Sequence, residues 1–505
     1  MSDMPITRCA CIDVGSGALT MLIVETDGQK IRVLDTLRKV TTLGRDCYAA
    51  GTIRHETVRE VCETLKGFGQ LLSEYGIEDV RVVATSAIRE ASNRELVIDQ
   101  IHLSTGFEVE VLSNAEERYL TYQGLENGLP GYLKMRREGM LIVDVGYGST
   151  EVTEIRGGRM IMSLNVKLGV LRLWELISSL AAENPRYPDI LEELILSSLG
   201  HLRGMVRLKD ITHCVVLSGE VDQLTRLAGG VVTRKRFNQL YEKVRGMTTA
   251  QLQREYGIQP ERAEILLPTL MVIRAFQDMT GAESLHLIDV SLRHGVAVDL
   301  CVRHGGVRLS EGGEEDILSV ARALGDREKY DDRHAQDVEE KSCQLFDALI
   351  PLHGMGRRER LLLRIAAILH DAGKRLSTVR HNEQSAALIA ASPIIGLSDG
   401  ELAVITFVVY HHSSHVFPGG SPVAELPLDR RLTALKLLAL IKLADSMDKG
   451  YRQKLSIEQI ELTADILRID VRTREDALLE RWIFGQNASA FKDVFGISPQ
   501  LRIRS

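Results

Sequence analysis

The sequence predicts an α/β protein with two related lobes, followed by an all-helical region and a small α/β tail. Strand-like and helix-like segments alternate through the first ~300 residues, and one glycine-rich motif occurs twice among them. Long helical patterns dominate beyond Ser310. Alternating strands and helices are typical of α/β domains, and a repeat at domain-size spacing indicates a duplicated lobe.

The expected elements follow from hydrophobic spacing. Residues 9–24 are apolar and β-branched around a glycine turn, and residues 56–75 have helical spacing. Short strands are expected at 80–84, 140–145, 151–155 and 213–217, and helices at 332–349, 358–370, 399–412 and 431–448. The tail combines strands at 457–462, 466–471 and 501–503 with a helix near 477–484. We therefore predict lobe I at 1–125, lobe II at 126–308, a helical domain at 309–453 and a small α/β domain at 454–505.

Composition excludes several classes of protein. Of the 505 residues, 62 are Lys or Arg and 69 are Asp or Glu, and the resulting net charge of −7 argues against a dedicated nucleic-acid binder. Seven scattered cysteines without a Cys-x-x-Cys pair indicate reduced thiols. No apolar run reaches the ~20 residues of a membrane span, and Asp13 interrupts the first apolar stretch. We expect a soluble cytoplasmic protein.

The repeated motif has the residue types of a phosphate-binding turn. Residues 12–17 read Ile-Asp-Val-Gly-Ser-Gly, and residues 143–150 read Val-Asp-Val-Gly-Tyr-Gly-Ser-Thr, so Asp144 follows Asp13 by 131 residues. Glycines expose backbone N–H groups to an anion, and an aspartate can hold a cation beside a phosphate. Two ordinary hairpin turns use the same residue types. Because the copies match, we favour paired phosphate-binding loops.

Two other segments carry charged side chains at strand ends. Residues 83–93 pass from a strand into hydroxyls and Arg89, which either binds phosphate oxygens or lies on the surface of an N-capped helix. Residues 109–118 end a strand with Glu116 and Glu117 at a helix start. A carboxylate there either complements the helix dipole or acts as a general base on water.

Together these motifs resemble the exopolyphosphatase and guanosine pentaphosphate phosphohydrolase family, within the actin-like (ribonuclease H-like) fold group. The family patterns Asp-x-Gly-Ser-Asn-Ser, Ala-Thr-Ser-Ala-x-Arg-Glu-Ala-x-Asn, Ser-Gly-x-Glu-Glu-Ala and Asp-x-Gly-Gly-Gly-Ser-Thr-Glu correspond to residues 13–18, 84–93, 113–118 and 144–151. The resemblance extends through residues 167–173, 260–264 and 291–295, and so covers about the first 300 residues.

The resemblance implies two actin-like lobes around a cleft and a hydrolase that releases terminal phosphate from polyphosphate or guanosine pentaphosphate. It implies that Glu117 aligns or deprotonates water, that Arg89 neutralises the transferred phosphoryl group, and that Mg²⁺ is held near Asp144. The expected phosphate-binding residues come from three loops: Asp13, Gly15, Ser16 and Gly17; Gly146, Tyr147, Gly148 and Ser149; Ser218 and Gly219. It also implies a homodimer, with no membrane and no specific nucleic acid as partners.

Several positions depart from the family pattern. Gly17 and Ala18 replace Asn and Ser, Tyr147 replaces a glycine, and Glu220 follows Ser218 and Gly219 where a threonine is usual. Asn114 and Arg118 also depart from the pattern, because they replace the Gly and Ala that flank the two glutamates. These changes are compatible with altered substrate choice and with lost catalysis.

The helical region has a separate signature. His334, the pair His370 and Asp371, and the distant Asp445 resemble the pattern of HD-domain metal phosphohydrolases. Imidazoles and carboxylates in this order can hold Mn²⁺, Mg²⁺, Fe or Zn²⁺, and we expect the four side chains to converge. Four further histidines are candidates for outer or substrate contacts: His381, His411, His412 and His415. The alternative is an inherited helical domain that no longer binds metal.

Three functions remain open at this stage. The first is hydrolysis in the N-terminal cleft. The second is hydrolysis of a nucleotide phosphate at the metal of the helical domain. The third is a catalytically silent sensor that binds a phosphorylated nucleotide or polyphosphate and signals through the helical domain.

Overall fold

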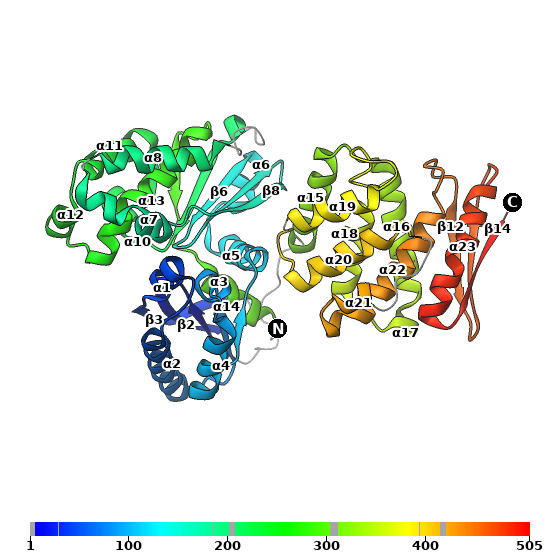
Figure 1. Ribbon diagram of the computed structural model, residues 1–505, viewed down its shortest axis with the longest axis horizontal. Helices are drawn as coiled ribbons and strands as arrows, with labels where there is room; N and C mark the ends of the chain where they lie inside the picture. Colours follow the sequence, from blue (N-terminus) through cyan, green and yellow to red (C-terminus); the bar gives the residue numbers. More distant parts are fainter. Residues whose placement is uncertain are drawn as a thin grey trace. The chain divides into compact units, whose positions relative to one another are not determined.

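The computed structural model describes residues 6–28, 30–184, 186–200, 208–303, 312–392, 394–414 and 421–504. The chain forms two compact units, Met1–Gly313 and Glu314–Ser505 (Figure 1). The expected boundary between residues 308 and 309 lies outside the described residues, and the finer division into four domains stays a prediction.

The first unit begins with a five-stranded sheet in the order β3-β2-β1-β4-β5. Strand β2 is antiparallel to β1 and to β3, whereas β4 pairs in parallel with β1 and β5 pairs in parallel with β4. The strands are β1 (Thr7–Val14), β2 (Ala18–Thr26), β3 (Ile31–Val40), β4 (Val80–Ala84) and β5 (Val109–Val111). The helices among and after them are α1 (Leu43–Ala50), α2 (His55–Tyr75), α3 (Ser86–Glu90), α4 (Arg94–Thr105), α5 (Asn114–Gly128) and α6 (Tyr132–Glu138).

A six-stranded sheet follows in the order β10-β11-β9-β6-β7-β8 and repeats this plan. Val14 lies opposite Leu19 in the first sheet and Val145 lies opposite Thr150 in the second, so the same register recurs 131 residues later. The strands are β6 (Met140–Val145), β7 (Thr150–Arg156), β8 (Arg159–Val166), β9 (His213–Ser218), β10 (Val231–Thr233) and β11 (Ser284–Leu287). The helices are α7 (Val170–Glu183), α8 (Tyr187–Ser198), α10 (Val221–Ala228), α11 (Arg234–Arg245), α12 (Thr249–Tyr256), α13 (Pro260–Met279) and α14 (Leu292–Arg303). The expected pair of related lobes is confirmed.

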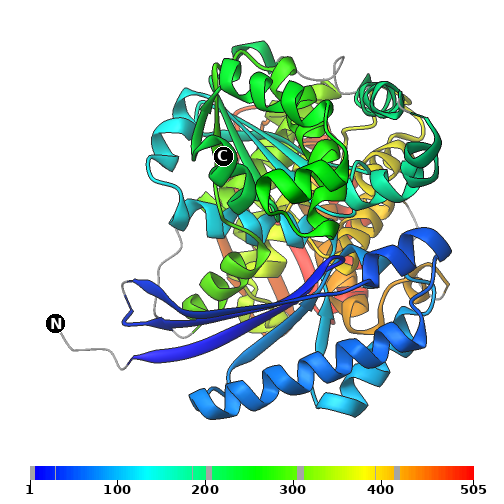
Figure 2. The same cartoon turned by 90° about the vertical axis from the view of Figure 1, so that its left-hand side faces the viewer.

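Alternating residues of β1 bury both faces of the first sheet. Ala10 and Ile12 pack into the cluster that includes α2, which runs along the blue sheet in Figure 2. Cys9 and Cys11 point to the other face, where α14 packs. Helix α14 belongs to the segment assigned to lobe II from the sequence, but its apolar side covers β1, β2 and α5. The boundary at residue 308 did not anticipate this return to the first lobe.

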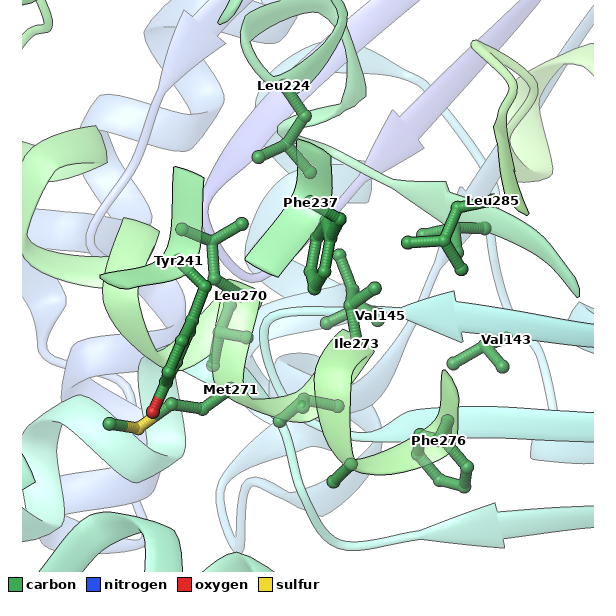
Figure 3. Close-up of a cluster of buried hydrophobic side chains, with 14 of the residues drawn as sticks. Val143, Val145, Leu224, Phe237, Tyr241, Leu270, Met271, Ile273, Phe276 and Leu285 are labelled. Atoms are coloured by element: carbon green, nitrogen blue, oxygen red, sulfur yellow. The ribbon is translucent and has the colours of Figure 1, made fainter. Parts of the chain in front are cut away.

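The core of the second lobe fixes the end of β6 that carries Asp144. Val143 and Val145 pack against Phe237, Ile273 and Phe276 from helices α11 and α13 (Figure 3). The alternation along β6 leaves Asp144 on the opposite side from this cluster, because successive strand residues face opposite ways.

The second unit is helical and ends in a three-stranded sheet, β12-β13-β14. Its helices are α15 (Gly312–Arg327), α16 (Asp332–Ala348), α17 (Ile350–His353), α18 (Arg357–Leu369), α19 (His381–Ala391), α20 (Asp399–His411), α21 (Ser421–Ala424) and α22 (Arg431–Ser446). The tail comprises β12 (Ser456–Leu462), β13 (Ile466–Arg472), α23 (Leu478–Phe495) and β14 (Ser498–Arg504). Helix α16 packs against α18 and α22. Among the helices described in either unit, none has the length and apolar character of a membrane span.

Candidate functional site

A cavity of about 330 Å³ in the first unit lies where β1 and β6 end. All of the expected catalytic and phosphate-binding residues except Arg89 line it: Asp13, Gly15, Ser16, Gly17, Glu117, Asp144, Gly146, Tyr147, Gly148, Ser149, Ser218 and Gly219. The structure thus brings three loops that are far apart in sequence to one cavity.

The two glycine turns have the same backbone geometry. The Gly15 N–H donates to the Ala18 carbonyl at 3.1 Å, and the Gly146 N–H donates to the Ser149 carbonyl at 2.9 Å. Each turn joins two antiparallel strands and carries an aspartate one residue before the strand ends. The matched geometry presents two similar turns to one cavity.

Residue 148 has to be a glycine because side chains of the first lobe lie close to its backbone. A Cβ at residue 148 would clash with the Tyr48 hydroxyl and lie 2.6 Å from Ser86 Oγ. These two groups and Ser16 Oγ form a triangle of hydrogen bonds of 2.8–2.9 Å. Side chains of the first lobe therefore lie where a Cβ at residue 148 would be, and the role of Gly148 in phosphate binding stays a prediction.

Six carboxylates among the described residues line the cavity, and four of them come from the glycine motifs and the start of α5: Asp13, Glu117, Asp144 and Glu151. Desolvation and the charge of Glu117 raise the pKa of both Asp13 and Asp144 to about 7, although Arg293 partly offsets the effect at Asp13. Desolvation also raises the pKa of Glu151 well above its ordinary value, against the opposing charge of Arg118. Asp13 Oδ1 has no hydrogen-bond partner among the described residues. A hard cation with oxygen ligands fits this set.

Glu117 is held by Arg89. The Arg89 Nη1 donates to Glu117 Oε2 at 3.1 Å and to the Leu112 carbonyl at 2.5 Å, and its Nη2 donates to Asn114 Oδ1 at 2.5 Å. The guanidinium therefore holds the start of α5, and Arg89 is not among the residues that line the cavity. Arg89 therefore has a positioning contact with Glu117, and its expected contact with phosphate stays a prediction.

Glu116 caps the start of α5, unlike its neighbour Glu117, which lines the cavity. Its carboxylate accepts the Ser113 N–H at 2.9 Å, while Ser113 Oγ accepts the Glu116 N–H at 3.2 Å, which is a capping box. The cap turns Glu116 back onto the helix start and leaves Glu117 facing the cavity. Glu116 is accordingly not among the residues that line the cavity.

The second unit brings its four expected metal ligands together. His334 Nε2 lies 3.1 Å from His370 Nε2, 3.5 Å from Asp445 Oδ1 and 3.7 Å from Asp371 Oδ2. His370 Nε2 lies 3.6 Å from Asp371 Oδ2 and 3.9 Å from Asp445 Oδ1. Two ligands bound to one ion at about 2.1 Å lie roughly 3.0–3.4 Å apart, so the spacing fits a metal centre after a small contraction.

A second group of donors faces the other oxygen of Asp371. His381 Nε2 lies 3.4 Å and His412 Nε2 lies 3.7 Å from Asp371 Oδ1. Among the described residues, two groups of potential metal ligands share Asp371: His334 with His370, and His381 with His412. His411 packs instead against Phe407 and Tyr410, and His415 lies outside the described residues.

Hydrogen bonds orient these imidazoles. Nδ1 of His370 pairs with the Ala367 carbonyl at 2.8 Å and that of His412 with the Val409 carbonyl at 2.7 Å. A carbonyl accepts only from a protonated Nδ1, so each Nε2 is left as a lone-pair donor. Nδ1 of His334 lies 2.8 Å from Asp448 Oδ2. His412 Nε2 and Asp445 Oδ1 are both buried without a hydrogen-bond partner in the described structure.

Charge also shapes this cluster. Desolvation opposes protonation of His334, but the carboxylates of Asp445 and Asp448 outweigh it and raise its pKa to about 9. Desolvation lowers the pKa of His370 to about 4. Lys449 Nζ donates to Asp445 Oδ2 at 2.8 Å, and Lys374 Nζ donates to Asp371 Oδ2 at 3.4 Å. The cluster thus places ammonium groups beside its carboxylates.

Family comparisons match both units. The model of the Ppx/GppA phosphatase family matches residues 22–304, and that of Ppx/GppA phosphatase domain III matches residues 319–484. The chain belongs to the Ppx/GppA phosphatase family. A protein named guanosine-5'-triphosphate,3'-diphosphate pyrophosphatase from Aliivibrio fischeri is 23% identical over 452 residues, which are 86% of each chain.

Solved Ppx/GppA structures share the fold. An exopolyphosphatase from Cytophaga hutchinsonii is 21% identical with a TM-score of 0.54, and covers 60% of this chain and 100% of its own. The Aquifex aeolicus Ppx/GppA family member is 22% identical with a TM-score of 0.51, and covers 59% of this chain and 99% of its own. The first unit therefore has the actin-like α/β fold of this family.

Several residues of this Ppx/GppA cavity were missed from the sequence. Glu151 closes the second glycine motif, Thr121 lies one helical turn after Glu117, and Arg293 lies within the matched segment 291–295. Because these three residues lie in or next to the recognised motifs, their positions were the signals that could have identified them from the sequence. Arg38 and Arg262 also line the cavity, and nothing in their local sequence sets them apart from surface arginines.

Proposed function

We propose that the cleft of the first unit hydrolyses a terminal phosphoanhydride bond of inorganic polyphosphate or guanosine pentaphosphate. The observation that carries this proposal is Glu117, held by Arg89 and facing a cavity between two matched glycine turns. Family membership and the names of the relatives support the same reaction class.

In this proposal the turns bind the terminal phosphates. Backbone N–H groups of residues 15–17 and 146–149 bind phosphate oxygens without an intervening Cβ. Glu117 aligns the attacking water and accepts its proton, and Arg89 fixes the carboxylate so that it points into the cavity. The water oxygen forms a bond to the terminal phosphorus while the bridging phosphoanhydride bond to that phosphorus breaks, which releases orthophosphate and the shortened substrate.

Asp13, Asp144 and Glu151 are the residues that would hold Mg²⁺. The unpartnered Asp13 Oδ1 and the crowding of carboxylates support that fit. Bound Mg²⁺ neutralises negative charge on phosphate oxygens. The aspartates stand at equivalent ends of β1 and β6, so two rigid strands fix their separation.

A second candidate is metal-dependent phosphate ester or anhydride hydrolysis in the helical region, which we interpret as an HD-type domain followed by a small α/β domain. The observation that favours it is Asp371, whose two oxygens face two separate groups of histidines. Mn²⁺, Mg²⁺, Fe or Zn²⁺ fits imidazole and carboxylate donors, and Lys374 and Lys449 would bind phosphate oxygens. A homodimer, implied by the resemblance, and a cytoplasmic location, expected from composition, both remain predictions.

Phosphate release by matched variants tests both candidates. Wild-type protein, Glu117→Gln and Asp371→Ala are each given polyphosphate and guanosine pentaphosphate. We expect release by wild type and by Asp371→Ala, and strong loss in Glu117→Gln. Loss in Asp371→Ala alone would assign the reaction to the helical region, and binding without release by wild type would leave the sensor function.

A further inference from the structure

Tyr147 fills the space among three turns of the cleft. A Cβ added to Gly17 would lie 2.8 Å from Cε1 of the Tyr147 ring, and one added to Gly219 would lie 3.2 Å from Cε2. The ring therefore excludes a larger side chain at Gly17 and crowds one at Gly219. Tyr147 and Gly17 both depart from the family pattern, and they form a matched pair in which the ring occupies the room that glycine leaves.

Polar contacts hold the ring in this position. The Tyr147 hydroxyl donates to Glu220 Oε1 at 2.8 Å and accepts from Arg38 Nη2 at 3.3 Å. Glu220 is only 1% exposed and lies 3.3 Å from Arg262 Nε. Burial and the charge of Glu220 raise the pKa of Tyr147, so the hydroxyl stays protonated and can donate.

These contacts engage two cavity arginines that otherwise suit a polyanion. Arg262 Nη1 also lies 3.1 Å from Asp222 Oδ2, so two carboxylates already share its charge. Arg38 and Arg262 both line the cavity, as does Asp222. A run of phosphates passing this side would meet a tyrosine ring and two carboxylates, and would have to displace Glu220 from Arg262. An uncharged group meets no such repulsion.

We propose that Tyr147 and Glu220 determine specificity, by closing this side of the cleft to a long phosphate chain and favouring a short phosphate run followed by the uncharged ribose and base of a nucleotide. The proposal rests on the proposed hydrolysis in this cleft. It assigns a common purpose to the changes at Gly17, Tyr147 and Glu220, which otherwise remain separate departures.

The test compares substrates within each variant. We expect the double variant Tyr147→Gly with Glu220→Thr to raise kcat/KM for long-chain polyphosphate, relative to guanosine pentaphosphate, by about tenfold or more, because one blocked contact costs at least that factor. Glu220→Gln keeps the ring and removes the charge, and Tyr147→Phe keeps the ring and removes the hydroxyl. Both should shift the ratio less than the double variant.

Affinity measurements distinguish an error in this specificity proposal from an error in the proposed hydrolysis. The affinities of long-chain polyphosphate and guanosine pentaphosphate are also measured in the Glu117→Gln background, with and without the double change, and thermal unfolding confirms folding. A shift in the affinity ratio without turnover by wild type would support the specificity role and overturn hydrolysis. An unchanged ratio in both kcat/KM and affinity would overturn the role of Tyr147 and Glu220.

Discussion

The carboxylates of the cleft in the first unit have a raised pKa, whereas those of the histidine–aspartate cluster in the second unit have a lowered pKa. This cluster comprises His334, His370, Asp371, His381, His412 and Asp445. The cleft is built from backbone turns on two sheets, with partly exposed carboxylates whose pKa is raised. The cluster is built from largely buried side chains on or next to five helices (α16, α18, α19, α20 and α22), and desolvation there is outweighed at Asp371 and Asp445, whose pKa lies well below the ordinary value.

The difference indicates separate ligands. Turns that line a cavity suit an anionic substrate that enters and leaves, whereas converging imidazole lone pairs suit a resident metal ion. A carboxylate with a lowered pKa is already balanced by neighbouring positive charge, but one with a raised pKa requires a cation to ionise fully. The predictions below test whether each region has the assigned ligand.

The largest effect is expected at Glu117. Glu117→Gln should lower kcat by roughly 10²-fold or more while substrate affinity stays near wild type, because the amide cannot accept the proton from water. Steady-state phosphate release and a binding isotherm measure the two quantities. Glu116→Gln is the matched control and should change kcat far less, since that side chain caps α5. Equal turnover in wild type and Glu117→Gln would remove the chemistry from the cleft.

Metal content should distinguish the two donor groups of the second unit. Protein purified without chelator should lose its bound transition metal in Asp371→Ala, because that carboxylate faces both groups. His412→Ala should lose only the portion held by His381 and His412, leaving about half of the metal. Elemental analysis measures the content, and His411→Ala is the control. Equal, negligible metal in wild type and Asp371→Ala would favour an inherited scaffold.

The raised pKa of Asp144 predicts a pH-dependent stability in metal-free protein. An acid whose pKa rises from 3.8 to about 7 on folding favours the folded state below pH 3.8, and this contribution is lost as pH rises through 7. Relative to wild type, Asp144→Asn should therefore gain about 2–4 kcal/mol between pH 4 and pH 8. Calorimetry of the full chain measures the change. Added Mg²⁺ should reduce the difference at pH 8; a difference independent of pH would contradict the prediction.

The smallest effect is expected at Gly148. Gly148→Ala should weaken substrate binding by roughly tenfold, because the added Cβ forces Tyr48 and Ser86 away from the second turn. Adding Tyr48→Phe should restore part of the affinity, since it removes one of the clashing oxygens. Binding isotherms compare the three proteins. Wild-type affinity in Gly148→Ala would show that the close approach of Tyr48 does not shape this site.

Hydrophobic patterns in the sequence predicted those parts of the fold that depend on residues close together in the chain. The strands at Val80–Ala84 and Met140–Val145 have the expected bounds because apolar residues dominate both segments, with Arg81 and Asp144 as the charged exceptions. Glu117 was identified by its position in a motif. The role of Arg89, the ring of Tyr147 against Gly17, and the packing of α14 could not be predicted, because each depends on residues brought together only by tertiary structure.

The return of α14 to the first lobe sets an order for folding during synthesis. Cys9 and Cys11 on β1 remain uncovered until Val296, Leu300 and Cys301 are available to pack over them. At 5–20 residues per second, the ribosome needs roughly 10–35 s to pass from the end of the first lobe's own segment to α14. During that interval one face of the nascent sheet is apolar and open. The first lobe is therefore completed only after the second has been synthesised.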